Sequence, residues 1–198
     1  MKKALVLFLV MFILIMFNNT VNAQDNGYRA FGIGVNVLDI SGILSGGGST
    51  IYLPINLGPA FRIEPFLGLG TTSYDYKDSD ADESYTSFQI GTGIYPTIRK
   101  GNAVIYIGGR LGVGFSSDEQ KDSNGDVYVE DSDFTFGIGP VVGGEYYFNP
   151  HISLGGEASI MYSSTKNKRD YKDEFTPDRE ETDTHIGTGS MIFFRFYF

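Results

Sequence analysis

The sequence predicts an all-β fold, an eight-stranded antiparallel up-and-down transmembrane β-barrel with short periplasmic turns and longer extracellular loops. Three observations support this fold class. Apolar and polar residues alternate in eight segments, the links between the segments alternate in length, and the apolar face carries almost no charge. A period of two residues is typical of strands whose two faces meet different environments. The 198 residues, with 26 Gly, 16 Phe and 13 Tyr, fit a single ordered domain.

The composition excludes several classes of protein. The absence of Cys excludes disulfide frameworks, thiol catalysis and Cys-based zinc sites. A formal charge of −9 argues against a nucleic-acid partner, because phosphates require a basic surface. We therefore expect neither a nucleic acid nor a cofactor.

Residues 1–23 are predicted to be a cleaved signal peptide. Lys2 and Lys3 precede an apolar run over residues 4–17, and the segment ends in the small residue Ala23. The alternative, an N-terminal membrane anchor, is disfavoured because a spanning helix needs about 20 apolar residues. We expect residues 24–198 to form a barrel domain exported to the cell outer membrane.

Each predicted strand is an alternating run bounded by turn-forming residues. In chain order, the predicted strands are 28–39, 49–57, 61–76, 85–99, 103–117, 126–148, 151–165 and 184–198. Their alternating apolar positions include Ile33 and Val35, Ile51 and Leu53, Ile63 and Leu67, Ile90 and Ile94, Ile105 and Ile107, Phe136 and Ile138, Leu154 and Ile160, and Ile192 and Phe194, respectively.

The links between these strands alternate in length along the chain. The links after the second, fourth and sixth strands are short, at 58–60, 100–102 and 149–150. The links after the third, fifth and seventh strands are longer and polar, at 77–84, 118–125 and 166–183. An even number of strands with short turns at one end and long loops at the other is typical of outer-membrane barrels.

The face opposite the apolar residues carries most of the strand glycines and seven charged residues. A cation placed at mid-depth on the lipid side of a barrel costs about 2–4 kcal/mol, so the charged face must line the lumen. An eight-stranded lumen is just wide enough for side chains to fill, and buried charges must pair. We therefore predict a lumen charge network that plugs the barrel, with a narrow channel for small solutes as the alternative. Its residues are Arg62, Glu64, Arg99, Arg110, Glu145, Glu157 and Arg195.

The final strand alternates aromatic residues up to the last residue of the chain. Together with the strand layout and the segments 61–68 and 149–157, this strand resembles the small outer-membrane β-barrel proteins of the OmpX-like and OmpA transmembrane-domain-like group. The resemblance implies that Phe194, Phe196 and Phe198 form the C-terminal signal presented to the barrel-assembly machinery. We also predict a monomer in contact with outer-membrane lipid, in which the basic residues of the segment 166–179 could bind the anionic headgroups of lipopolysaccharide.

The acidic residues gather at the end of the predicted barrel that carries the long loops. Of 24 Asp and Glu residues, 19 lie within 75–83, 118–133 and 170–183. Ser123-Asn124-Gly125-Asp126 predicts a type I′ turn, so the hairpin 118–133 is expected to project beyond the membrane. An unpaired edge on this hairpin could bind a surface protein by strand addition. We predict a structural or adhesion-like role through these acidic loops.

Two further interpretations of the sequence compete with this role. His185, with Ser159 and Ser163 on the neighbouring strand, could serve a lipid-A-modifying barrel enzyme, but the sequence contains no adjacent His-Ser pair. The Asp-rich segments 78–83 and 122–126 lack the Gly and Glu spacing of a calcium loop. The prediction is therefore a protein that is not an enzyme and has neither a catalytic nor a metal site.

Overall fold

The computed structural model describes residues 29–37, 49–75, 82–121, 127–172 and 176–198. These residues form antiparallel strands that close into a ring, because β2 pairs with β1 on one side and with β4 on the other. The strands are β1 (Gly32–Asn36), β2 (Ser49–Tyr52), β3 (Ile55–Asn56), β4 (Phe61–Asp75), β5 (Asp82–Lys100), β6 (Ala103–Lys121), β7 (Val127–Asn149), β8 (Ile152–Tyr171) and β9 (Arg179–Tyr197).

The predicted eight-stranded ring is confirmed, although one of its strands is interrupted. β2 and β3 both pair with β4 and occupy one position in the ring. Pro54 lies between them, and proline has no N–H to donate to a strand ladder. The Pro54 carbonyl instead accepts a hydrogen bond from the Gly32 amide, at 2.9 Å, so the chain stays in place across the break.

Short turns connect the strands at one end of the ring. Gly58, between β3 and β4, has φ 77°, and Gly101, between β5 and β6, has φ 58°. These left-handed conformations favour glycine, which explains why these two turns carry it. The predicted short turns at this end are confirmed by the bounds of β3 to β6.

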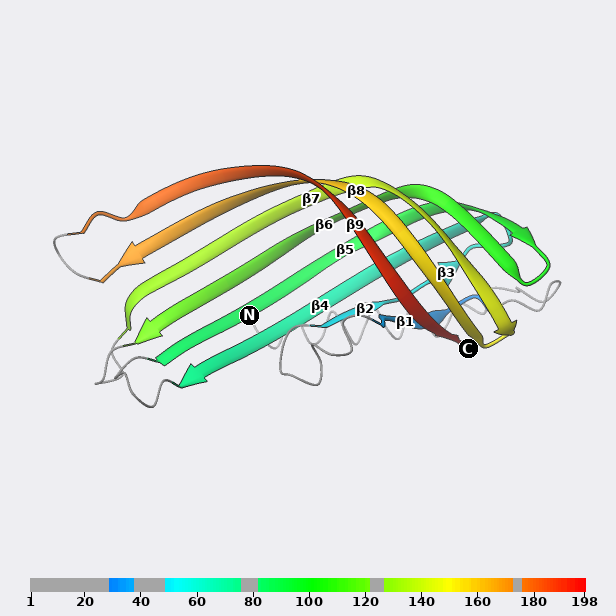
Figure 1. The fold of residues 1–198 in the computed structure, drawn as a ribbon, viewed down its shortest axis with the longest axis horizontal. Helices are drawn as coiled ribbons and strands as arrows, with labels where there is room; N and C mark the ends of the chain where they lie inside the picture. The colour runs from blue at the N-terminus through cyan, green and yellow to red at the C-terminus, as the bar shows by residue number, and fades with distance from the viewer. Residues whose placement is uncertain (1–28, 38–48, 76–81, 122–126, 173–175) are drawn as a thin grey trace.

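The strands at the other end extend further than the sequence predicted. β5 to β9 contain 19 to 23 residues each, whereas about 9–11 residues are enough to cross a bilayer. Parts of the predicted loops 77–84, 118–125 and 166–183 are therefore strand. Figure 1 shows β4 to β9 running together toward the long loops, while β1 to β3 are short. We call the part of β5 to β9 beyond the apolar surface the outer sheet; it comprises residues 82–86, 117–121, 127–132, 167–171 and 179–184.

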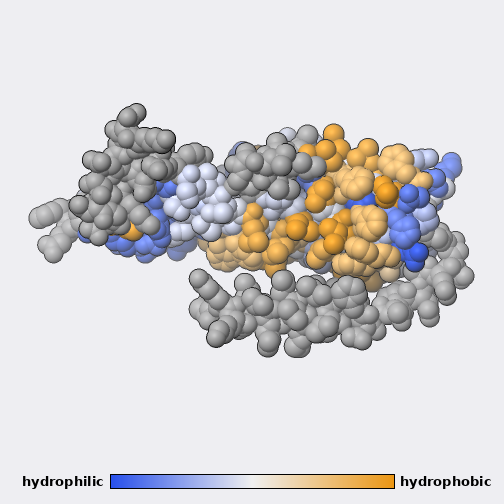
Figure 2. All heavy atoms as spheres, turned by 90° about the horizontal axis from the view of Figure 1, so that it is seen from below, coloured by the Kyte–Doolittle hydropathy of each residue, from blue (hydrophilic) through white to orange (hydrophobic). Residues whose placement is uncertain are grey.

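Apolar side chains on the outside of the ring form a band that stops well before the ends of the long strands. Figure 2 shows this band over the half of the molecule nearer the short turns, with hydrophilic residues over the other half. Exposed residues of the band include Ile107, Ile138 and Ile160. Within the described residues, no helix is long and apolar enough to cross a membrane. The predicted signal peptide, residues 1–23, lies outside the described residues.

Aromatic rings border the apolar band on both sides. Phe115 packs against Phe88 and Phe134 on the adjacent strands, with ring centroids 6.4 and 5.2 Å apart. Near the short turns, Phe148 packs against Tyr146 at 5.6 Å. Phe134 and Phe148 lie 14 residues apart on β7, which corresponds to about 34 Å along the membrane normal for a strand tilted by about 45°. This spacing is close to the thickness of a bilayer core of about 30 Å.

Candidate functional site

The charged residues in the lumen occupy alternate positions on the strands, so their side chains point to the ring interior. Five of the seven face a glycine on a neighbouring strand, which leaves room for a long side chain, whereas Arg62 faces Asn56 and Tyr95 and Arg99 faces Val104. A Cβ added at Gly34, for example, would lie 2.8 Å from Cγ of Arg195. The cross-strand pairs are Glu64–Gly93, Arg110–Gly139, Glu145–Gly155, Glu157–Gly143 and Arg195–Gly34.

Glu145 lies at the centre of the deepest part of the lumen. Its carboxylate forms an ion pair with Arg62 and accepts a hydrogen bond from Nη1 of Arg195 at 2.6 Å. The Tyr197 hydroxyl lies 3.2 Å from both of its oxygens, and the Ser153 hydroxyl donates to Oε2 at 3.4 Å. The side chains of Glu145, Arg62 and Arg195 are all 0% exposed.

The same pattern of alternating charges continues toward the outer end of the lumen. Nη2 of Arg195 lies 2.5 Å from Glu64, and Nη2 of Arg110 lies 3.3 Å from the other oxygen of Glu64. Arg110 also donates to Glu157 at 2.5 and 3.0 Å. These contacts connect six side chains in space, in the order Arg62–Glu145–Arg195–Glu64–Arg110–Glu157, and we call this series the ion-pair chain. Its three cations and three anions cancel, which satisfies the requirement that buried charges be paired.

Six of the seven residues predicted for the lumen charge network belong to this ion-pair chain, and Arg99 does not. Arg99 lies at the short-turn end of β5, where it donates to the carbonyl of Pro59 at 3.1 Å and to the side-chain oxygen of Asn56 at 3.1 Å. The same Asn56 oxygen accepts a hydrogen bond from Nε of Arg62 at 3.0 Å. Its guanidinium carbon also lies 6.0 Å from the ring centre of Tyr147, whose hydroxyl accepts a hydrogen bond from Arg62 at 3.2 Å. Arg99 therefore meets the chain indirectly, through Asn56 and Tyr147, because its position on the strand is close to the turn.

Asn56, Ser153 and Tyr197 are lumen residues that the sequence analysis did not identify. All three are buried, and all three continue the alternation of the residues that it did identify. Assigning every second residue of each strand to the lumen, up to the short turns, would have identified them. Phe193 also supports the chain, since the guanidinium carbon of Arg195 lies 3.6 Å from the centre of its ring.

The predicted C-terminal signal residues lie on the opposite face of β9 from Arg195. Phe194, Phe196 and Phe198 are exposed on the outside of the ring. Phe198 stacks with Phe31 at 5.9 Å and packs edge-on against Phe196 at 5.2 Å. The last residue of the chain is thereby joined to the first strand, which holds the ring closed at this end.

The hairpin 118–133 is formed by β6 and β7, and over its described residues, 118–121 and 127–133, both strands have a neighbour on their other side. β5 pairs with β6 as far as Lys121, and β8 pairs with β7 as far as Val129. The expectation that a partner strand could be added to this hairpin is therefore wrong. The hairpin lies in the middle of the outer sheet because its neighbours extend as far as it does.

Acidic residues on the inner face of the outer sheet lie next to one another. Asp118 pairs across the strands with Asp131, which accepts two hydrogen bonds of 2.6 Å from Arg169. Partial burial, followed by the neighbouring Glu83 carboxylate, raises the pKa of Asp118 above its usual range. Asp118 is therefore easier to protonate than an isolated carboxylate.

His185 is exposed and lies opposite Ser163 on β8, as the two residues are partners in register. Within the described ranges, no hydrogen bond joins the imidazole of His185 to a Ser hydroxyl. In the same ranges no group of three or more His, Asp or Glu side chains has the geometry of a metal site. The Asp-rich segments 78–81 and 122–126 lie outside the described residues.

The family model of the outer membrane protein beta-barrel domain matches residues 7–185. The chain belongs to this family. Its alternation, ring closure and apolar band are thereby those of an outer-membrane barrel. No curated protein sequence matches the chain.

Three solved outer-membrane proteins resemble the fold of this family member. A major outer membrane protein from Thermus thermophilus has a TM-score of 0.53 and 12% identity, covering 85% of this chain and 97% of its own. Ail, the attachment invasion locus protein of Yersinia pestis, has a TM-score of 0.46 and 8% identity, covering 86% and 98%. CarO of Acinetobacter baumannii has a TM-score of 0.41 and 10% identity, covering 88% and 100%. The first of these supports the fold alone.

Proposed function

We propose that this outer-membrane barrel is a non-enzymatic protein whose lumen is plugged and whose role is structural or adhesion-like. The plug is the observation that carries the proposal. Four consecutive members of the ion-pair chain, from Arg62 to Glu64, have fully buried side chains and extend across the lumen from β4 to β7 and β9. Tyr95, Tyr106 and Tyr147 fill the space around them and are also buried.

The energetics of the ion-pair chain argue against the alternative of a narrow channel. A conducting path would require several of these pairs to separate at the same time. Breaking one buried ion pair by removal of a partner costs about 3–5 kcal/mol, because the remaining charge is left uncompensated. Each of the four inner members of the chain also pairs with two partners of opposite charge, so movement of one side chain disturbs the next.

The outer sheet supports the second part of the proposal, a role at the cell surface. Its strands continue past the aromatic row of Phe88, Phe115 and Phe134 into water. It is rich in charge, and it carries exposed ion pairs such as Arg179–Glu181 at 2.8 Å. A rigid charged surface held away from the membrane is suited to contact with other molecules at the envelope.

Lipopolysaccharide is the proposed lipid partner on the outside of the barrel. Lys166 is the cross-strand partner of Phe134, so it lies at the height where lipid headgroups begin. Lys166 and Lys168 are half-exposed and pair with Glu180 and Asp170, both at 2.7 Å. Phosphates in the headgroups could compete for these cations. During insertion, the exposed Phe194, Phe196 and Phe198 would be presented to the barrel-assembly machinery.

Planar-bilayer recording tests the plug. The refolded protein is expected to insert without stable current steps, whereas Glu145→Ala, which leaves Arg62 and Arg195 without their shared partner, is expected to produce open events. Insertion is checked independently by the different gel mobility of boiled and unboiled samples. Steady single-channel steps from the unmodified protein would support the channel and contradict the plug.

A further inference from the structure

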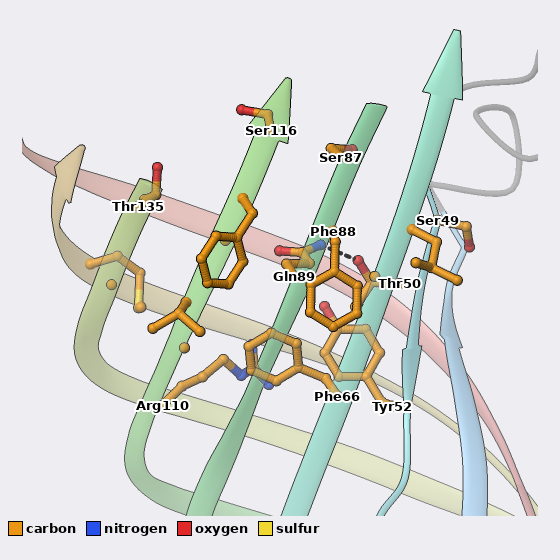
Figure 3. A pocket seen from close by; sticks show the side chains of 18 of the residues that line it. Ser49, Thr50, Tyr52, Phe66, Ser87, Phe88, Gln89, Arg110, Ser116 and Thr135 are labelled. Atoms are coloured by element: carbon orange, nitrogen blue, oxygen red, sulfur yellow. Dashed lines mark hydrogen bonds between the residues drawn. The ribbon is translucent and has the colours of Figure 1, made fainter. Parts of the chain in front are cut away.

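The lumen opens into a cavity of about 590 Å³ between the ion-pair chain and the outer sheet. We call this cavity the cup and define it by Thr50, Tyr52, Phe66, Gln89, Arg110 and Ser116. Figure 3 shows Arg110, Phe66 and Tyr52 at one end of the cup, with Ser87, Ser116 and Thr135 at the other. Its volume lies within the range of small-molecule sites, about 300–1,000 Å³.

The floor of the cup is rigid and electrically neutral. Arg110 is 12% exposed and is fixed by Glu64 and Glu157. Its guanidinium lies over the rings of Tyr52 and Phe66, at 5.3 and 5.8 Å from their centres. Because the ion-pair chain below has equal numbers of cations and anions, the floor offers no net charge to a ligand.

The walls offer uncharged hydrogen-bonding groups. Nε2 of Gln89 donates to the hydroxyl of Thr50 at 2.6 Å, as the dashed line in Figure 3 marks. Among the described residues this is the single hydrogen bond of the Gln89 amide, so its carbonyl oxygen and second N–H face the cup with capacity to spare. The hydroxyl of Ser116 donates to the carboxylate of Asp133 at 3.1 Å, so it can accept a hydrogen bond from a ligand hydroxyl. The ring of Tyr52 adds an apolar surface.

Two wall glycines keep the cup open where packing does not require glycine. A Cβ at Gly114 or Gly137 would meet no atom closer than 3.8 Å, and neither residue has a positive φ. By contrast, a Cβ at Gly91 or Gly139 would clash with a backbone carbonyl. A larger side chain would therefore fit at Gly114 and Gly137, and its effect would be to fill the cavity.

We propose that the cup binds an uncharged polyhydroxyl compound with the size of a mono- or disaccharide. Hydroxyls of such a ligand would bond to Gln89 and Ser116, and its C–H surface would pack on Tyr52 and Phe66. Anions are disfavoured because the acidic outer sheet lies above the opening, and cations find no unpaired carboxylate on the floor. The site is independent of the surface role proposed above.

The test uses full-length protein refolded in a phosphocholine detergent, which carries no sugar headgroup. Glucose and maltose are titrated by calorimetry, with glucosamine and glucose 6-phosphate as cationic and anionic versions of the same ring. The uncharged sugars are expected to bind saturably and more tightly than both charged ones. Absence of saturable binding by glucose and maltose, or tighter binding of a charged sugar, would overturn the proposal.

Matched variants locate the site. Gly114→Leu fills the cup and is expected to abolish binding, whereas Gly109→Leu, at an exposed glycine on the opposite face of the same strand, is expected to leave binding unchanged. Gln89→Ala, which changes no strand glycine, is expected to weaken binding about fivefold through the lost hydrogen bonds. Each variant is first shown to be folded by its gel mobility before boiling. Equal affinity for Gly114→Leu and the unmodified protein would overturn the assignment to the cup.

Discussion

Glu145 is the residue on which closure of the lumen depends most, because it compensates two buried arginines at once. Glu145→Ala is expected to lower the free energy of unfolding by about 3–5 kcal/mol, since Arg62 and Arg195 lose their shared partner. The matched control is Glu181→Ala, which removes an exposed pair with Arg179 and should cost at most about 1 kcal/mol. Urea unfolding in lipid vesicles measures both values. Equal losses for the two variants would show that Glu145 has no special role.

Asp118 gives the outer sheet a pH dependence. Its pKa is raised in the folded protein, so the folded state binds the proton more tightly than the unfolded state. Its stabilising contribution is therefore complete below the ordinary Asp pKa of 3.8 and is lost as pH rises through the raised value. Asp118→Asn should remove this dependence and slow amide exchange in β6 at neutral pH. Hydrogen exchange of the variant and the unmodified protein, compared at each pH, checks this; parallel pH profiles would contradict it.

At the scale of the strand, the membrane boundary divides β6 and β7 into parts with different tolerance to charge. Ile107 lies near mid-depth of the apolar band, whereas Ser132 lies on the same outer face of the ring in the outer sheet. Ile107→Lys is expected to lower the free energy of unfolding by about 2–4 kcal/mol, and Ser132→Lys by less than about 0.5 kcal/mol. Equilibrium refolding into vesicles measures both. A tolerated lysine at Ile107 would contradict contact with lipid.

The outer ends of the strands could not be predicted from the sequence. Apolar residues alternate only where a strand faces lipid, so the pattern stops at the membrane surface although the strand continues. Between Ser116 and Lys121 both faces of β6 meet water, so polar residues occupy every position and the segment looks like a loop. The faces were predictable, since Arg62, Glu145 and Arg195 all point into the lumen as their alternation required. The position of each side chain along the barrel axis was not predictable. The predicted network therefore includes Arg99, although this residue lies beside the short turn.

The whole molecule has the reverse of the arrangement found in a soluble protein, with apolar residues outside and charged residues inside. Apolar side chains face outward, glycines and ion pairs fill the centre, and the strands continue into water as a charged sheet. This arrangement explains how the described residues form an ordered domain without any Cys: the membrane covers the apolar surface that a soluble protein would bury. The ion-pair chain then takes the place of a hydrophobic core inside the ring.

The absence of native Cys allows the most direct test of this arrangement, a scan of single cysteines along β6. Val104 and Tyr106 are at most 1% exposed, whereas Ile105 and Ile107 are 59% and 65% exposed. In vesicles, Ile105→Cys and Ile107→Cys are expected to react with a lipid-soluble thiol reagent, and Val104→Cys and Tyr106→Cys are expected to be protected. The opposite alternation, or equal labelling at all four positions, would contradict a barrel that turns its apolar face to the lipid.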